Sequence, residues 1–373
     1  MSASEKLGIA AAVAGLGAFG GLAAAGVARV VTRSSRDESD DPCAGVDFTE
    51  IYADDASSVR ADDGVVLAVR TVHLGGLDAD AEPELTVIFT HGLSLRMASW
   101  HFQRFALAGS WANRRIRMVF FDQRGHGRSA AAPPETCTIA QISDDVAAVM
   151  RTVAPRGPVV LVGHSMGAMA LMALARRRAE LFGPDGQVVG VACVAAAARG
   201  LTETGLARGL GNPLVGVFRA AVRHAPSVVE AGRGVTRMIL EPMLGAGSFG
   251  PDFHSRTADR VVAKMIQHTP ISTVVNFLNA LEQHDETEGL PVLAQVPTAV
   301  VCGSVDMITP LPKSLHMYRS LGADSRLDVV EGAGHMVLIQ TPERVTDAIA
   351  DLVDRVSPAR SRSPRYASVR GHR

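Results

Sequence analysis

The stretch "VVLVGHSMGAMALMAL", from Val159 to Leu174, decides the fold. It begins as an apolar run, breaks at the pentapeptide GHSMG (163–167), and continues as an alanine- and leucine-rich run typical of a helix. A serine between two glycines, where a buried strand meets a helix, matches the G-x-S-x-G pattern. The glycines permit a tight turn that lifts the serine hydroxyl above the sheet edge. The stretch therefore predicts that Ser165 is a nucleophile.

A serine nucleophile needs a base, and the base needs an acid that orients it. The run "TAVVCGSVDMITP" ends one predicted strand and presents Asp306, and "LDVVEGAGHMVLIQTPE" ends the next and presents His335. Serine, acid and histidine then follow one another in the chain order that accompanies this turn. Asp285, Asp324 and Glu331 compete for the orienting role, but none follows a strand so directly. We therefore expect Asp306 and His335 to complete a triad.

The run "VIFTHGLSLRMASW" ends another predicted strand at His91-Gly92. Gly92 would allow the turn to fold the next amide inward, towards developing negative charge. The backbone amides of Leu93 and Met166 are the predicted oxyanion donors. We expect the His91 side chain to stabilise the turn, and Ser94 is a candidate for substrate contact.

The segment "FFDQRGHGRS" (120–129) lies between two predicted strands. Asp122, Arg124 and His126 are residue types that catalyse reactions, so the segment has two interpretations. The favoured one is a structural loop, in which charges and glycines fix a turn near the site.

Several short apolar runs are typical of buried parallel strands. They are Leu85–Thr90, Arg117–Phe121, Val159–Val162, Val188–Ala195, Thr298–Cys302 and Leu327–Val330. Some of these runs are separated by segments whose apolar residues recur at helical spacing, namely Ile139–Val153 and Ala168–Ala179. Two earlier runs, Ser57–Arg60 and Val65–Val72, flank "ADDG", a hairpin signal. This alternation predicts an α/β fold with a doubly wound, mainly parallel sheet.

The alternation stops between about Leu201 and Leu290, where helical periodicity recurs at Arg260–Gln267 and Ser272–Leu281. We expect a helical cap at 201–292, inserted between two parts of one core at 57–200 and 293–357. Its apolar residues either line an acyl pocket or form the cap's own core. They are Met238, Ile239, Leu240, Met243, Leu244, Phe249, Phe253, Met265, Phe277 and Leu278.

Residues 7–28 form an uncharged, alanine- and glycine-rich stretch long enough to span a bilayer. The segment 1–36 is accordingly a predicted membrane anchor, followed by a polar linker at 37–56. Arginines follow the apolar stretch, which favours a single pass with a cytoplasmic catalytic domain. A cleaved export signal and a soluble or surface-lying helix are the alternatives. The basic tail, 358–373, is predicted to be disordered.

The 373 residues are 47% hydrophobic and 20% charged, with a formal net charge of −1. Nothing in this balance favours nucleic-acid binding. The four cysteines form no C-x-x-C pair and no zinc-like spacing, so they are predicted to be free core thiols. No metal site is expected.

As a set, these motifs resemble the α/β-hydrolase fold superfamily over about 59–356. The residues that carry the resemblance are His91-Gly92, Asp122–Ser129, Gly163–Gly167, Asp306 and His335. The resemblance implies an eight-stranded, mostly parallel sheet with a helical cap and no metal or organic cofactor. It also implies Ser165 as nucleophile, His335 as base and Asp306 as orienting acid. An apolar segment ahead of such a domain resembles membrane-anchored actinobacterial hydrolases.

The resulting hypothesis is a serine hydrolase that cleaves carboxylic esters of apolar or lipid-like acyl groups through an acyl-enzyme. Superfamily members with an aspartate nucleophile, such as epoxide hydrolases and dehalogenases, are disfavoured by Ser165. Three alternatives stay open. The first two are that the triad catalyses a different reaction, as in a carbon–carbon hydrolase or a cofactor-free haloperoxidase-like enzyme. The third is that the chain is an inactive membrane-tethered binding protein. The sequence does not indicate an oligomeric state.

Overall fold

The structure is a computed structural model that describes residues 41–203 and 247–357. The apolar stretch 7–28, the basic tail and the middle of the predicted cap lie outside the described residues. Within the described ranges, none of the helices combines the length and apolar character that crossing a membrane requires.

The described chain builds one eight-stranded sheet in the order β1-β2-β4-β3-β5-β6-β7-β8. In chain order the strands are β1 (Asp55–Arg60), β2 (Val66–His73), β3 (Leu85–Thr90), β4 (Ile116–Phe121), β5 (Val159–His164), β6 (Val188–Val194), β7 (Thr298–Gly303) and β8 (Arg326–Val330). β2 is antiparallel to both of its neighbours, β1 and β4, and the other pairs are parallel. The predicted mostly parallel sheet is thereby confirmed.

Helices separate the parallel strands, because a parallel connection must cross back over the sheet. The α-helices are α2 (His101–Ser110), α3 (Ile139–Val153), α4 (Met166–Arg177), α8 (Arg256–His268), α9 (Ile271–Glu282), α10 (Leu290–Leu293), α11 (Leu311–Tyr318), α12 (Val337–Gln340) and α13 (Pro342–Val356). Short 3-10 turns are η2 (Glu50–Ala53), η3 (Met97–Trp100), η4 (Pro134–Thr136), η5 (Ala179–Leu181), η6 (Leu201–Glu203) and η8 (Thr287–Gly289).

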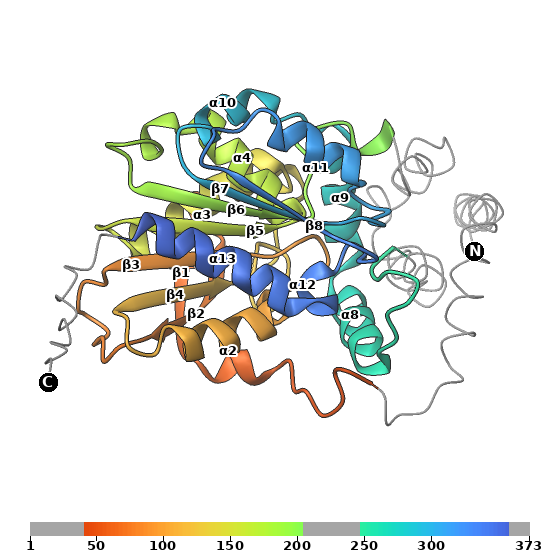
Figure 1. The fold of residues 1–373 in the computed structure, drawn as a ribbon, viewed down its shortest axis with the longest axis horizontal. Helices are drawn as coiled ribbons and strands as arrows, with labels where there is room; N and C mark the ends of the chain where they lie inside the picture. The colour runs from red at the N-terminus through yellow and green to blue at the C-terminus, as the bar shows by residue number, and fades with distance from the viewer. Residues whose placement is uncertain (1–40, 204–246, 358–373) are drawn as a thin grey trace, which may run out of the picture.

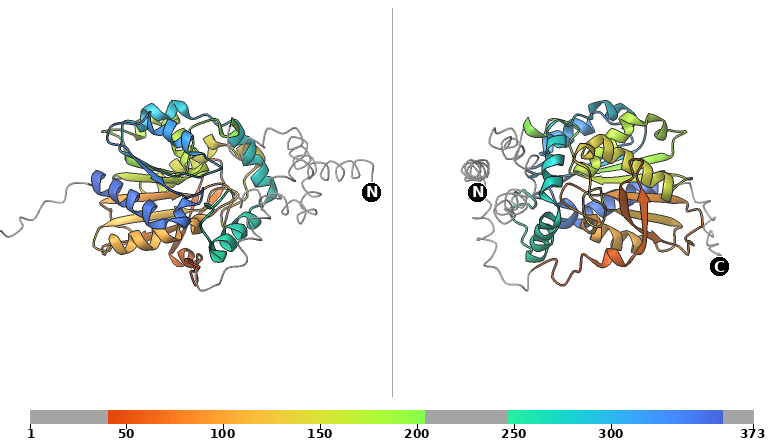
Figure 2. Two further views of the ribbon diagram at one scale, coloured as in Figure 1. Left: turned by 45° about the vertical axis from the view of Figure 1, so that its right-hand side comes forward. Right: turned by 180° about the vertical axis from the view of Figure 1, so that it is seen from behind.

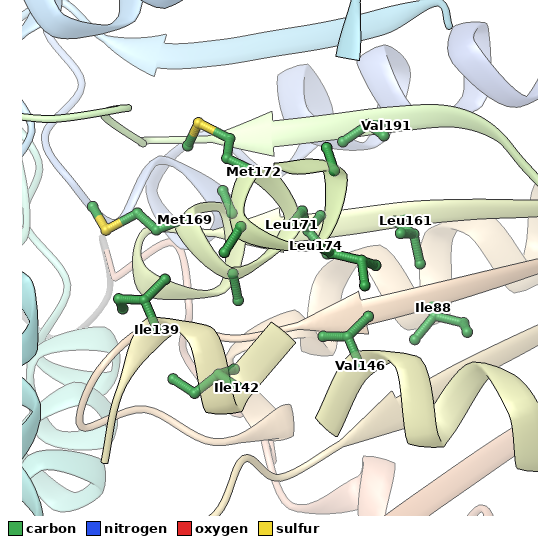
Figure 3. Close-up of a cluster of buried hydrophobic side chains, with 14 of the residues drawn as sticks. Ile88, Ile139, Ile142, Val146, Leu161, Met169, Leu171, Met172, Leu174 and Val191 are labelled. Atoms are coloured by element: carbon green, nitrogen blue, oxygen red, sulfur yellow. The ribbon is translucent and has the colours of Figure 1, made fainter. Parts of the chain in front are cut away.

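The helices cover both faces of the sheet, so there are two hydrophobic layers. α3 and α4 pack on one face, and α2 and α13 pack on the other (Figures 1 and 2). Figure 3 shows the first layer, in which Ile142 and Val146 of α3 lie near Leu171 and Leu174 of α4. With apolar cover on both faces, the central strands β3 and β5 are buried at every residue.

The predicted hairpin is confirmed at its turn. Gly64, between β1 and β2, has a φ of 90°, a left-handed value that glycine adopts without steric cost. β1 and β2 then pair in antiparallel register from Asp55 opposite Thr71 to Arg60 opposite Val66.

Between β6 and β7 the described parts of the chain contain helices and no strand, so the strand–helix alternation stops there as predicted. α8 and α9 lie at one end of the sheet in each view (Figures 1 and 2). Val274 and Leu278 of α9 pack against Leu93, just after β3. This end is therefore the carboxyl edge of the parallel strands, where ligands bind in open α/β sheets.

Candidate active site

Ser165 is the single residue between β5 and α4, and its backbone is strained. Its φ is 52° and its ψ is −121°, a left-handed φ that a residue with a side chain rarely adopts. Its N–H donates to the carbonyl of Val194 on β6 at 2.9 Å, and its own carbonyl accepts from the amide of Met169 at 3.1 Å. These bonds hold the turn from the sheet side and from the helix side.

The flanking glycines are required because the start of α4 lies at very short range from β5 and from the end of β3. A Cβ on Gly163 would lie 2.6 Å from the backbone nitrogen of Ala168. A Cβ on Gly167 would lie 2.3 Å from the carbonyl oxygen of Thr90, at the end of β3. The strand–turn–helix context that the G-x-S-x-G pattern requires is therefore present.

Asp306 and His335 meet although 29 positions separate them. The His335 Nδ1 lies 2.9 Å from the Asp306 Oδ2, and both side chains are buried. The other oxygen, Oδ1, accepts from the amides of Ile308 and Thr309 at 2.7 and 2.9 Å. The carboxylate is thus fixed from one side and faces the imidazole with the other.

The pKa of Asp306 lies below its usual range. Burial alone would raise it, but the positive potential and hydrogen bond of His335, together with bonds from Thr309, outweigh the burial. The carboxyl is therefore ionised at neutral pH and accepts from the N–H of the His335 Nδ1. That tautomer leaves the opposite nitrogen, Nε2, with a free lone pair.

His164 joins this pair to the serine turn. Its Nε2 donates to the carbonyl of His335 at 3.1 Å, and the two rings lie 4.8 Å apart between centroids. His335 consequently packs against the residue that directly precedes Ser165. Burial, followed by the nearby His335 ring, lowers the pKa of His164 to about 3, so this ring stays neutral.

Two backbone amides belong to segments next to Ser165, one in the loop after β3 and one at the start of α4. A Cβ on Gly92 would come within 3.1 Å of the Ser165 Cβ, which brings the loop after β3 close to the serine. Leu93 follows in that loop, and Met166 opens α4. Neither amide donates a hydrogen bond to another group in the described chain. Both N–H groups, which the sequence singled out, therefore remain available for a ligand.

The loop after β4 supports the loop after β3 through two histidines. The His91 Nδ1 donates to the carbonyl of Gly92 at 2.8 Å, and its Nε2 accepts from the amide of Gln123 at 2.9 Å. The His126 Nε2 accepts from the amide of Ser94 at 3.1 Å. Both rings serve to fix the backbone, as expected for His91.

Burial keeps both of these imidazoles neutral. It lowers the pKa of His126 to about 4, and it places the pKa of His91 well below the usual range, with His126 adding to the effect. A neutral ring is needed at both positions, because each uses a lone pair to accept a backbone amide.

Asp122 and Arg124 are structural, which confirms the favoured interpretation of their loop. The Asp122 Oδ1 accepts from the amide of Met97 at 2.8 Å. The Arg124 guanidinium is fully buried and bonds Asp145 and Asp63, at 2.7 and 2.6 Å. These contacts occupy both charged groups within the protein.

The rival acids lie in other environments. Asp285 accepts from the amide of Thr287 at 3.0 Å, and Asp324 and Glu331 are exposed. Asp306 alone of the four has a described hydrogen bond to His335.

The cysteines are free and buried, as predicted, with Cys193 in β6 and Cys302 in β7. In residues 41–203 and 247–357 no three His, Cys, Asp or Glu side chains gather in a way that could hold a metal ion.

Two polar residues at the site were not identified from the sequence. The Thr309 hydroxyl donates to the Asp306 Oδ2 at 2.7 Å, and its oxygen lies 3.3 Å from the His335 Nδ1. The Gln340 side chain bonds the glycines that precede His335. Thr309 follows Asp306 by three positions, a spacing that local side-chain bonding could have suggested. Gln340 gives no such signal, because its partners are backbone groups.

Comparisons with known proteins agree with this fold. A family model described as the alpha/beta hydrolase family matches residues 87–348. The curated protein "Putative carbamate hydrolase RutD" of Caulobacter sp. (strain K31) is 25% identical over 283 residues, covering 75% of this chain and 93% of that protein.

Solved structures give the same picture. The esterase EaEST from Exiguobacterium antarcticum superposes with a TM-score of 0.62 at 20% identity, over 80% of this chain and 100% of that chain. The enol-lactonase from Burkholderia xenovorans LB400 gives 0.62 at 22% identity, over 80% and 100%. At such identities these likenesses show the fold alone. Because the family model spans most of the chain and the sheet order agrees, the protein belongs to the alpha/beta hydrolase family.

Proposed function

We propose that the protein is a serine hydrolase that cleaves carboxylic esters, with Ser165 as nucleophile, His335 as base and Asp306 as orienting acid. One observation carries the proposal. The Asp306–His335 pair, joined at 2.9 Å, packs against a strained turn that presents a serine. Nucleophile, base and orienting group in this order form the arrangement that activates a hydroxyl.

The reaction proceeds in two halves. The His335 Nε2 takes the proton of Ser165 as the hydroxyl oxygen attacks the ester carbonyl, and a tetrahedral oxyanion forms. The same nitrogen then gives that proton to the leaving alcohol, and an acyl-enzyme remains. Water, deprotonated by His335, attacks the acyl carbon, and the imidazolium then returns that proton to the Ser165 oxygen as the carboxylic acid leaves. Asp306 stays ionised and stabilises the imidazolium in each half.

The amides of Leu93 and Met166 are the proposed oxyanion donors. Their N–H groups are unused within the described chain and flank Ser165. The N-terminus of α4 adds its positive dipole end at the same point. In enzymes of known mechanism, losing one such donor costs about 100- to 1000-fold in kcat.

The acyl group is proposed to be apolar. Leu93 packs against Val274 and Leu278 of α9, which gives the oxyanion loop an apolar neighbour. Phe249, Met265 and Phe277 instead pack within the two main hydrophobic layers, so they are core residues. The other apolar cap residues highlighted in the sequence lie outside the described residues, except Phe253, which is packed at the edge of one layer.

Ser94 is a proposed substrate contact. Its backbone has a φ of 60°, and its buried hydroxyl has no hydrogen-bond partner in the described chain. A buried hydroxyl without a partner costs stability. A polar group of the substrate would relieve that cost.

The decisive experiment combines active-site labelling with a substrate series. A fluorophosphonate probe should label the wild type on Ser165, and Ser165→Ala should lose both labelling and hydrolysis of p-nitrophenyl esters. Ser143→Ala is the matched control, because Ser143 is also buried but bonds the Ala140 carbonyl within α3. Normal hydrolysis by Ser165→Ala would refute the mechanism. A preference for acetate over longer acyl esters would refute the apolar pocket.

Membrane attachment through residues 7–28 stays a proposal that rests on the sequence. The full-length protein should sediment with membranes and resist extraction by alkaline carbonate. Complete release by carbonate would exclude a spanning anchor.

A further inference from the structure

The loop that carries His335 is bonded to a distant segment of the chain. Residues 247–250, which lead into α8, lie against residues 332–336. The Met336 amide donates to the carbonyl of Ser248 at 2.6 Å, and the His335 amide donates to that of Gly247 at 3.4 Å. We call 247–250 the return segment and 332–336 the base loop.

The two backbones approach too closely for a side chain at Gly250 or at Gly334. A Cβ on Gly250 would lie 1.8 Å from the carbonyl oxygen of Gly332. A Cβ on Gly334 would lie 2.6 Å from the carbonyl carbon of Phe249. Displacement of the return segment would therefore move the base loop directly.

One side chain bonds both segments. The Gln340 Oε1 accepts from the amide of Gly250 at 2.9 Å and from that of Gly334 at 3.0 Å. Its Nε2 donates to the carbonyl of Gly332 at 3.1 Å. Gln340 is the last residue of α12, only five positions after His335. An amide side chain suits this place, because the partners include two donors and one acceptor.

We propose that Gln340 is a positioning residue that fixes His335 and makes its position depend on the return segment. This inference rests on the proposed role of His335 as the base. Within the predicted cap range, the second described stretch begins with the return segment and continues into α8. A shift of α8 would therefore reach the base loop through the return segment and Gln340. A base displaced by about 1 Å costs on the order of 100-fold in rate.

Two substitutions separate the contacts. Gln340→Met keeps the length but removes all three bonds, and Gln340→Glu keeps the two acceptor bonds and loses the donor to Gly332. Gln103→Met is the matched control, since Gln103 is buried and donates to the carbonyls of Leu338 and Pro342, which lie outside the base loop.

The first readout is independent of catalysis. Hydrogen–deuterium exchange should become faster in the return segment and in the base loop together in Gln340→Met, less so in Gln340→Glu, and in neither segment in Gln103→Met. Faster exchange in only one segment, or in neither, would overturn the coupling.

The second readout is kinetic. Gln340→Met should lose about 10- to 100-fold in kcat with an unchanged KM, and Gln340→Glu should fall in between. Loss of thermal stability with unchanged kcat would show a purely structural residue and overturn the inference. If the wild type cleaves no ester, the proposed function fails, and hydrogen exchange alone decides whether Gln340 couples the two segments.

Discussion

Asp306 uses its two carboxylate oxygens for different tasks. Oδ1 accepts from the backbone amides of Ile308 and Thr309, and Oδ2 accepts from the Thr309 hydroxyl and faces His335. The backbone amides fix which oxygen points outward. An amide side chain at this position would consequently keep its oxygen on the backbone and turn its NH₂ group towards the histidine.

Asp306→Asn should therefore fold normally and lose activity. Its NH₂ group would donate a hydrogen bond to the His335 Nδ1, so that Nδ1 must be the unprotonated nitrogen and the ring hydrogen lies on Nε2. That tautomer cannot take the proton of Ser165, and a fall in kcat of about 10⁴-fold is expected. Steady-state kinetics on a p-nitrophenyl ester, with melting temperatures alongside, measure it.

Asp324→Asn is the control, because Asp324 is exposed. It should match the wild type in both measurements. An Asp306→Asn enzyme that keeps wild-type kcat would show that another group orients the base.

The acid and the base could be predicted from the sequence, because each has a reactive side chain and follows a predicted strand. Asp306 and His335 follow strands, and the structure joins them with a hydrogen bond. The same reasoning could not find Gln340, since its partners are backbone groups, one of them 90 positions away. A residue of almost any type can supply a backbone amide, so the partners of Gln340 cannot be identified from their residue types.

At the scale of elements, the crossing of β5 and α4 governs the site. Predicted and observed strands agree to within two residues at each end, because continuous apolar runs bounded by turns identify buried strands. α13 has Val345, Ile349 and Leu352 on one buried face, a helical spacing that can be seen in the sequence alone. α2 buries only His101, Gln103 and Leu107, so polar residues obscure its pattern.

Gly167→Ala tests how closely α4 approaches the end of β3, next to its crossing with β5. The new methyl group would lie 2.3 Å from the Thr90 carbonyl oxygen and 2.6 Å from that of His91. The helix must then move off β3, which should lower the free energy of unfolding by about 1–3 kcal/mol. Since the same movement displaces the amides of Leu93 and Met166, kcat should fall as well. Urea unfolding and ester kinetics measure the two effects.

Gly109→Ala is the control, because the same change from glycine to alanine should there raise the free energy of unfolding. Gly109 lies in α2, and nothing lies within 4 Å of its would-be Cβ. Alanine there should raise the free energy of unfolding by up to about 1 kcal/mol and leave kcat alone. Equal changes in the free energy of unfolding and in kcat for Gly167→Ala and Gly109→Ala would contradict the close approach of α4 to β3.

Across the whole molecule, three buried imidazoles make the fold sensitive to acid. Burial lowers the pKa of His164 to about 3 and that of His126 to about 4, and His91 is shifted in the same direction. In the unfolded chain each has a pKa of about 6.5. Folding therefore favours the neutral rings, and their stabilisation is complete above about pH 6.5 and declines as the pH falls towards the folded values.

The free energy of unfolding should accordingly fall between pH 7 and pH 5. Each ring contributes up to about 1.4 kcal/mol per pH unit in that window. His126→Gln should be less stable at pH 8 but show a shallower slope, because glutamine does not titrate. Urea midpoints at several pH values measure the slope.

His268→Gln is the control for the titration, since His268 is exposed on α8. Its slope should equal that of the wild type. A wild-type midpoint that stays constant from pH 7 to pH 5 would show that the buried rings do not titrate as described.

The contact between the return segment and the base loop also bears on protein engineering. Chimeras that exchange the insert between β6 and β7 are an obvious route to new specificity. A junction placed just ahead of α8 would import a foreign residue at position 250, opposite Gly332, where a Cβ has no room. A chimera should therefore take residues 247–250 and the base loop from the same parent protein.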